Sequence, residues 1–335
     1  MPNLVIKKYT DDMQEKWDQF VQYHSFNGTF LQTRNFLNYH GNKFKDASII
    51  IYKGQDTIVA VVPACVIQTQ DKNICYSHAG STFGGIVIGE TFYDIEHMDA
   101  VMQILELYWR QQGYDEVTLR QTSEIFSKKN TGLLDYFLHK YGYVSYDELS
   151  CYVDFREYNA DIISNFSAAK RRGYRYALNN NLVLKKIEKD EEVTEFYRVL
   201  CLNLEKYDTR PVHSCSELLD FKNQRLRDSV EFYAVYMEER MVAGSMVFKF
   251  ENRVFHTQYL AADPAYLKFY SMYYLDEELI SLAMKRGFRY FSFGISTEEQ
   301  GKVLNKSLAQ FKEGFGTQFA VNRIYTKKIG GMCQD

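Results

Sequence analysis

The chain contains an apolar hairpin, Phe232-Tyr233-Ala234-Val235-Tyr236, Glu238-Glu239-Arg240 and Met241-Val242-Ala243-Gly244-Ser245-Met246-Val247-Phe248. Aromatic and branched residues on both sides of a charged turn are typical of two paired β-strands. A helix that closes at Arg286-Gly287-Phe288 and an apolar strand at Tyr290-Phe291-Ser292-Phe293 follow. This order of hairpin, helix and strand predicts an α/β unit.

The same order occurs earlier in the chain. A hairpin at Ser48–Tyr52 turns through Lys53–Asp56, further strands follow, a helix ends at Gln112-Gly113-Tyr114, and a strand covers Glu116–Leu119. A shared order of elements at a long period indicates duplication. We therefore predict two α/β domains of one type, at residues 1–148 and 149–330.

Hydrophobic periodicity and turn residues place the remaining elements. The expected strands include 4–8, 57–67 with a bulge or edge at Pro63, 73–78, 182–186, 254–261 and a closing strand at 318–325. The expected helices are 93–112, 164–178, 191–206, 217–227, 271–285 and 307–315.

Length and composition agree with two domains. The chain has 335 residues, of which 46% are apolar, enough to build two cores. No signal peptide and no apolar run of about 18 residues is present, so we expect a cytoplasmic protein without a membrane span. The six cysteines are scattered without a CxxC pair, which indicates reduced thiols. They are Cys65, Cys75, Cys151, Cys201, Cys215 and Cys333.

The charge balance argues against a general nucleic-acid binder. The net charge is −3, whereas phosphate binding requires a basic face. One basic helix, Lys170-Arg171-Arg172 with Arg175, is the local exception. It is either a phosphate-binding surface or a solvated helix face.

Common catalytic motifs are absent. The sequence has no G-x-S-x-G, H-E-x-x-H, G-x-x-x-x-G-K-[ST] or G-x-G-x-x-G pattern, and we expect no metal. His78 and His256 fall on expected strands, where a structural role is the commoner one.

The segment Phe311-Lys312-Glu313-Gly314-Phe315-Gly316 is the strongest local signal for chemistry. A lysine beside phenylalanines can pack its aliphatic stem and present its ammonium at a pocket, where it would stabilise an oxyanion formed when an amine attacks an acyl group. The alternative is a surface lysine whose stem lies along the protein.

The span from about Ser167 to Gln318 resembles the C-terminal half of the Fem-type (FemAB/FemX) acyltransferases of the GNAT superfamily and their relatives in polysaccharide biosynthesis. The matching segments are Lys170–Arg175, Thr209-Arg210-Pro211, Met241–Val247, Tyr266–Ala283, Gly287 with Phe291–Gly294, and Phe311-Lys312. Trp17-Asp18-Gln19-Phe20 and Asn27–Gln32 resemble the opening of that family. The resemblance implies two tandem GNAT-like domains, each a mixed, mostly antiparallel sheet flanked by helices, with an acyl-transfer site in the second.

The resemblance also implies roles for individual residues. Lys312 matches a lysine beside the reacting acyl carbonyl, and Phe311 precedes it. Arg210 matches an arginine that contacts a nucleotide diphosphate, with an ion pair to Asp208 or a neighbour as the alternative. Tyr270 matches a tyrosine near the acceptor, with packing at a helix start as the alternative. We expect Lys170 and Arg171 to hold phosphates.

Three departures from the family pattern bear on the substrates. Peptidoglycan-bridge enzymes tend to have an acidic and a basic residue at two positions where this chain has Arg120-Gln121-Thr122 and Asn38. This difference argues against a UDP-linked muramyl peptide as the acceptor. The long helical arm of larger Fem proteins is missing. The donor is either an acyl-CoA or an aminoacyl-tRNA, but only Lys170-x-x-Gly173 approaches the pyrophosphate-binding turn of a typical GNAT. A general base, if one is needed, is His256, Glu313 or Asp263.

Three functions follow. The first is an N-acyltransferase that moves an acetyl or aminoacyl group onto an amine of a cell-envelope precursor, such as an amino sugar, a nucleotide sugar or a peptide. The second is a non-catalytic carbohydrate- or protein-binding module on the same duplicated fold. The third is an aminoacyl-tRNA-dependent Fem-type peptidyltransferase, with tRNA as a partner. The oligomeric state is left open.

Overall fold

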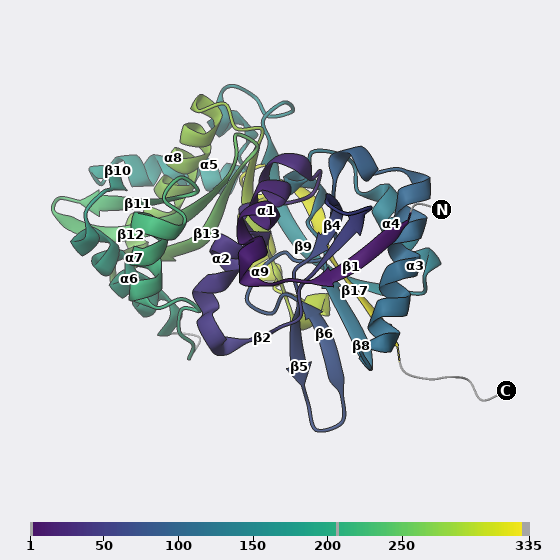
Figure 1. The fold of residues 1–335 in the computed structure, drawn as a ribbon. Helices are drawn as coiled ribbons and strands as arrows, with labels where there is room; N and C mark the ends of the chain where they lie inside the picture. The colour runs from purple at the N-terminus through teal and green to yellow at the C-terminus, as the bar shows by residue number, and fades with distance from the viewer. Residues whose placement is uncertain (1–2, 206–207, 330–335) are drawn as a thin grey trace. The chain divides into compact units, whose positions relative to one another are not determined.

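The computed structural model describes residues 3–205 and 208–329 (Figure 1). Their contacts divide the chain into two compact units. The first unit comprises Met1–Glu148, Glu299–Lys302 and Val321–Asp335, and the second comprises Leu149–Glu298 and Val303–Ala320. The sequence predicts a second domain that is continuous over residues 149–330. In the structure, residues 321–328 of the last described strand belong to the first unit instead. Lys206, position 330 and Cys333 lie outside the described residues.

The described part of the first unit contains two sheets. One has the strand order β1 (Leu4–Lys8), β3 (Ile49–Lys53), β4 (Thr57–Val62) and β7 (Val87–Ile88). The other has the order β17 (Gln318–Lys328), β8 (Glu116–Arg120), β6 (Asn73–Ser77), β5 (Cys65–Gln68) and β2 (Lys45–Asp46). β6 and β8 are parallel, and the other pairs are antiparallel. The expected single strand 57–67 is therefore wrong, because the chain changes sheets at Pro63.

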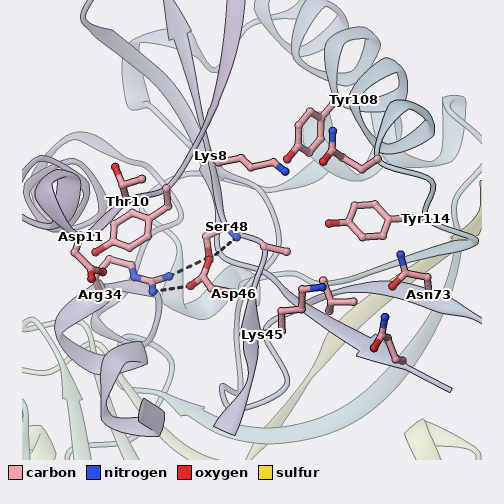
Figure 2. A pocket seen from close by; sticks show the side chains of 15 residues that line it. Lys8, Thr10, Asp11, Arg34, Lys45, Asp46, Ser48, Asn73, Tyr108 and Tyr114 are labelled. Carbon is pink, nitrogen blue, oxygen red and sulfur yellow. Dashed lines mark hydrogen bonds and ion pairs between the residues drawn. The ribbon is translucent and has the colours of Figure 1, made fainter. Parts of the chain in front are cut away.

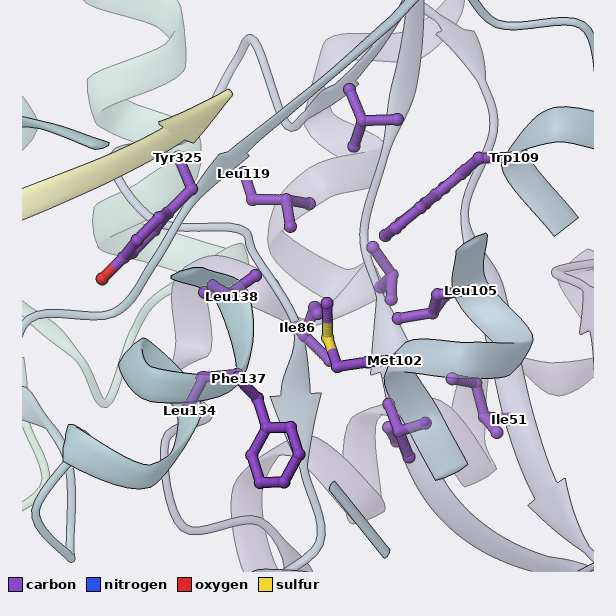
Figure 3. Packing of buried hydrophobic residues seen from close by; sticks show 14 of the residues in the cluster. Ile51, Ile86, Met102, Leu105, Trp109, Leu119, Leu134, Phe137, Leu138 and Tyr325 are labelled. Carbon is purple, nitrogen blue, oxygen red and sulfur yellow. The ribbon is translucent and has the colours of Figure 1, made fainter. Parts of the chain in front are cut away.

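Helices cover these sheets and close a core between them. They are α1 (Gln14–Gln19), which continues into the π-helical turn η2 (Phe20–His24), α2 (Arg34–Leu37), α3 (Ile95–Gln111) and α4 (Gly132–Lys140). Asp94 starts α3, its side chain accepting a hydrogen bond from His97 N at 2.9 Å. Apolar residues of α3 and α4, Met102, Leu105, Trp109, Phe137 and Leu138, meet Leu119 of β8 and Tyr325 of β17 in the core (Figure 3).

The second unit contains one larger sheet. Its strand order is β10 (Leu182–Ile187), β11 (Val230–Met237), β12 (Arg240–Phe250), β13 (Val254–Ala262), β14 (Tyr290–Ile295) and β9 (Val144–Asp154). β13 and β14 are parallel, and the other neighbours are antiparallel. A small hairpin of β15 (Thr297–Glu298) and β16 (Val303–Leu304) follows β14.

Helices lie on both faces of this sheet. They are α5 (Ala168–Leu178), α6 (Asp190–Glu205), α7 (Cys215–Asp220), η8 (Phe221–Arg225), η9 (Pro264–Phe269), α8 (Ser271–Lys285) and α9 (Lys306–Glu313). Phe232 and Tyr233 are neighbours on β11 and point to opposite faces. Phe232 packs on Phe196 of α6, whereas Tyr233 belongs to the core that α8 closes, and α5 packs on α8. The second unit is thus a sheet between α6 and the pair α5 and α8.

Each unit contains a parallel strand pair joined by a helix. In the first unit it is β6, α3 and β8, and in the second it is β13, α8 and β14. A crossover helix is the ordinary way to connect neighbouring parallel strands. The repeated order in the sequence corresponds to these two crossovers.

Candidate functional site

The parallel strands of the second unit pair along only part of their length. Val254–His256 pair with Tyr290–Ser292, and β13 then continues to Ala262 without β14 as a partner. The register between β12 and β13 also shifts at this level, between Met246 and Val247. The two parallel strands therefore separate after His256 and Ser292, and the space beyond the carboxyl end of a parallel strand is a common place for ligands in α/β proteins.

Lys312 lies at the carboxyl end of β14. It is only 5% exposed, and its Nζ donates hydrogen bonds to the carbonyl oxygens of Gly294 at 3.1 Å and Ile295 at 2.6 Å. Burial lowers the pKa of Lys312 to about 8, against the attraction of Cys151 and Asp276. The helix that holds Lys312, α9, is capped by Asn305. The result is a positive charge in a fixed position with one N–H left for another acceptor.

His256 of β13 stands beside this end of β14. Its Nδ1 is 3.0 Å from Ser292 Oγ, and Thr257 Oγ1 donates to Ser292 O at 3.2 Å. Burial and the nearby charge of Lys312 lower the pKa of His256 to about 4, so its imidazole is neutral at pH 7. The charge of Lys312 is thus close enough to affect the protonation of His256.

The other two candidates have different surroundings. Asp263 accepts a hydrogen bond from Ala265 N at 3.0 Å at the start of η9 and pairs with Arg240 at 3.2 Å. Glu313 is exposed on α9. Asp263 therefore already has a structural role in the described part of the chain.

Lys170 of α5 is buried against the aromatic side chains around α9. It is 5% exposed, and its Nζ lies 3.0 Å from the ring centroid of Phe311, 4.1 Å from that of Phe315 and 4.4 Å from that of Tyr273. Aromatic faces attract a cation at such distances. Lys170 thus packs directly on the residue that precedes Lys312.

Asp276 of α8 is the charged neighbour of Lys170. It is fully buried, and neither its carboxylate oxygens nor Lys170 Nζ has a hydrogen-bond partner among the described residues. Burial lowers the pKa of Lys170 and raises that of Asp276, and the attraction between them opposes both shifts. An electrostatic pair is therefore enclosed between α5, α8 and α9.

The remaining predicted site residues take separate positions. Arg171 donates from Nη1 to Phe166 O at 2.6 Å, at the start of its own helix. Tyr270 precedes α8 in the left-handed region, at φ 60°, with its ring 5.4 Å from that of Tyr273. Arg210 is exposed between α6 and α7. Ring contacts thus connect Lys170, Phe311 and Tyr270 through Tyr273, and no contact within the described ranges joins Arg210 to them.

Two residues of this cluster, Asp276 and Tyr273, were not predicted from the sequence. Asp276 has a detectable signal, because it stands in the same helical stripe as Leu275, Leu279 and Ile280, where an acid is unusual. Tyr273 has none, since the chain has 27 tyrosines and most of them are packing residues.

Within residues 3–205 and 208–329, no group of three or more His, Cys, Asp and Glu side chains is arranged to hold a metal ion. The helices of the same ranges include none with the length and apolar character to span a membrane.

Residues 164–302 match the family model described as "Acetyltransferase (GNAT) domain". This part of the chain is similar to GNAT acetyltransferase domains. The match covers α5 to β14, which includes the parallel strands and their crossover helix. No curated protein matches the sequence.

Solved structures with a similar fold extend the likeness over the whole chain. A structure titled "Crystal structure of FemX" has a TM-score of 0.69 at 11% identity, with 96% of each chain covered. The C-terminal domain of a putative lysylphosphatidylglycerol synthetase from Agrobacterium fabrum has a TM-score of 0.55 at 14% identity over 81% of each chain. A tandem GNAT protein from the clavulanic acid biosynthesis pathway has a TM-score of 0.52 at 10% identity, covering 98% of this chain and 100% of its own.

These comparisons confirm the predicted fold class and the resemblance to FemX-like GNAT proteins. Both units have the fold of tandem GNAT proteins, and residues 164–302 are similar to GNAT acetyltransferase domains.

Proposed function

We propose that the protein is an N-acyltransferase that moves an acetyl or aminoacyl group onto an amine of a cell-envelope precursor, such as an amino sugar or a peptide, with Lys312 as its catalytic residue. The observation that supports this best is the position of Lys312. A buried ammonium at the carboxyl end of β14, where β13 no longer pairs with β14, suits an acyl oxygen bound between the strands.

The proposed reaction has two steps. The acceptor nitrogen attacks the acyl carbon of a thioester or ester, and the carbonyl oxygen becomes an oxyanion that accepts a hydrogen bond from Lys312 Nζ. The oxyanion then reforms the carbonyl, the thiolate or alkoxide leaves, and an amide bond remains. The surplus amine proton goes to the leaving group or to water, or to the neutral His256.

Phosphates of the donor or acceptor require cations outside the reacting centre. Arg210 is exposed and suits a phosphate, because its planar guanidinium binds oxygen pairs. Lys170 and Arg171 remain proposed phosphate contacts. Lys170 is buried, and Arg171 already donates to a carbonyl oxygen before its own helix. Arg210 is therefore the best supported of the three phosphate contacts.

A donor assay tests the proposal. The purified protein is supplied with acetyl-CoA or with aminoacyl-tRNA, each with amino sugars, UDP-linked amino sugars and short peptides, and free CoA or labelled amide is measured. We expect turnover with one donor class and a loss of about 10²–10³-fold in kcat for Lys312→Met. Lys306→Met removes the same charge from the exposed start of α9 and is the matched control.

The outcomes separate the three functions. Turnover with acetyl-CoA supports an acyl-CoA enzyme, and turnover with aminoacyl-tRNA supports a Fem-type enzyme. Full activity of Lys312→Met contradicts the assigned role. No transfer from either donor, with carbohydrate binding retained, favours the binding module.

A further inference from the structure

The first unit holds an open pocket that the proposed acyl transfer does not use. Its volume is about 590 Å³, within the range of roughly 300–1,000 Å³ that is usual for small-molecule sites. Figure 2 shows side chains of β1, β2 and α2 facing side chains from the end of α3 and from β6. Most of these side chains are polar, which favours a polar ligand over an apolar one.

Arg34 fixes one end of the pocket. Its guanidinium lies 3.9 Å from the ring centroid of Tyr9, pairs with Asp46 at 2.6 Å and donates to Ser48 Oγ at 3.0 Å (Figure 2). Arg34 is 6% exposed, and the pair with Asp46 neutralises both charges.

Lys8 and Lys45 bring positive charge to the middle of the pocket. Both are exposed, and no ion pair or hydrogen bond connects either ammonium to a carboxylate in the part of the chain that the structure describes. Of the lining acids, Asp46 is paired with Arg34, and Asp11 lies at the Arg34 end (Figure 2). The region around the two lysines is therefore positively charged.

Neutral hydrogen-bonding groups face the lysines. Tyr108 and Tyr114 point their hydroxyls toward Lys8 and Lys45 (Figure 2). Burial raises the pKa of Tyr108 to about 12 and raises that of Tyr114 as well, so both remain hydrogen-bond donors at neutral pH. The two hydroxyls and the two lysine ammonium groups therefore offer several hydrogen-bond donors to one ligand.

We propose that this pocket binds a small hydroxylated oxyanion, a phosphate or carboxylate group on a sugar-sized body, with Lys8 and Lys45 contacting the anionic group. The tyrosine hydroxyls add hydrogen bonds to the same group, and the side-chain amides of Gln68 and Gln112, which also line the pocket, suit ligand hydroxyls. The proposal stands apart from acyl transfer, because no lining residue comes from the second unit.

Calorimetric titration of the full chain tests the site with four probes: glucose 6-phosphate, glucuronate, glucose and inorganic phosphate. We expect the two anionic sugars to bind and glucose to bind at least about tenfold more weakly. Higher salt should weaken the binding of the anionic sugars, because it screens their charge. A preference for glucose 6-phosphate or for glucuronate identifies the anionic group. Inorganic phosphate that binds as well as glucose 6-phosphate contradicts the part of the proposal that concerns the hydroxylated body.

Paired variants give the structural control. The double variant Lys8→Gln/Lys45→Gln should bind glucose 6-phosphate about tenfold more weakly or worse, because two charge contacts are lost. Lys7→Gln removes the same charge from the next position of β1, does not line the pocket, and should leave the affinity unchanged. Equal binding of glucose and its phosphate, unchanged affinity in the double variant, or no binding of any probe overturns the proposal. Lys312→Met should bind the probes normally, so this result is independent of the acyl-transfer test.

Discussion

Lys312 carries its positive charge only below its lowered pKa. Burial moves that pKa to about 8, so the charge is complete at pH 6.5 and is lost as the pH rises through 8 toward 10. An arginine keeps its charge throughout this range. Ionisation of the acceptor amine affects the wild type and Lys312→Arg equally, so its effect cancels in the ratio of their rates. We expect this ratio to fall about tenfold per pH unit above pH 8, as measured by kcat/KM between pH 6.5 and 10.

A constant ratio over this range would mean that the charge of Lys312 does not take part in the reaction. An Arg variant with no activity at any pH would leave the ratio undefined, and the comparison then uses Lys312→Met, whose residual rate should lack the alkaline decline of the wild type.

The buried pair of Lys170 and Asp276 leads to a prediction about the free energy of unfolding. Asp276→Asn leaves the charge of Lys170 buried without this partner, and Lys170→Met leaves Asp276 buried with the smaller influence of Lys312, whereas the double variant removes both charges of the pair. We expect Lys170→Met or Asp276→Asn alone to lower the free energy of unfolding by about 3 kcal/mol. The double variant should recover a large part of that loss, as measured by urea unfolding. Additive losses in the double variant would show that the two charges do not interact.

Some residues of the candidate site can be predicted from the sequence and others cannot. Lys312 and Phe311 are candidates from the sequence because a lysine between phenylalanines is a local pattern. The partners of Lys170 were not, because Asp276 and Tyr273 lie on another helix and meet Lys170 only through packing. A periodic pattern predicts which face of a helix is buried, but it does not predict which side chains meet across two helices.

At the scale of elements, the end of β14 depends on Gly294. Its φ is +71°, and a Cβ there would lie 3.1 Å from His256 Cε1. Gly287 has a similar φ of +76° but no atom within 4 Å of such a Cβ. Alanine at either position should cost about 1 kcal/mol of unfolding free energy from the left-handed conformation. Only Gly294→Ala should also lower kcat, because it displaces a carbonyl that holds Lys312.

Urea unfolding and steady-state kinetics of the two alanine variants, measured side by side, provide the check. Equal kcat values for Gly294→Ala and Gly287→Ala would show that the backbone at the end of β14 does not position Lys312.

Element order was more predictable than element membership. The repeated hairpin, helix and strand follow from alternating apolar patterns and turn residues, which are local properties of the chain. The region around Pro63 was not predictable in the same way. Val59–Val62 of β4 and Cys65 of β5 are buried, and the apolar Val66 and Ile67 follow, so the apolar run continues through the point where the chain moves from one sheet to the other.

At the scale of the whole molecule, the first unit depends on the last strand of the chain. Ile324–Lys328 of β17 pair with Glu116–Arg120 of β8, and Tyr325 is fully buried in the core (Figure 3). We expect residues 1–148 alone to lack cooperative unfolding, because β8 then has an open edge and the core has a cavity. Adding residues 318–329 through a flexible linker should restore a cooperative transition. Circular dichroism during thermal unfolding measures both.

A cooperative transition in residues 1–148 alone would contradict this dependence. A chain shortened to end at residue 317 gives a second measurement, since it keeps the second unit's helices and removes β17 with its buried side chains.

The late position of β17 also affects the synthesis of the protein. Ile324 leaves the ribosome roughly 200 residues after Arg120, its partner on β8, which at about 5–20 residues per second is a delay of about 10–40 s. During that time the nascent first unit exposes a strand edge and an incomplete core. This interval, rather than any weakness of the finished fold, is when the protein is most open to aggregation and most in need of a chaperone.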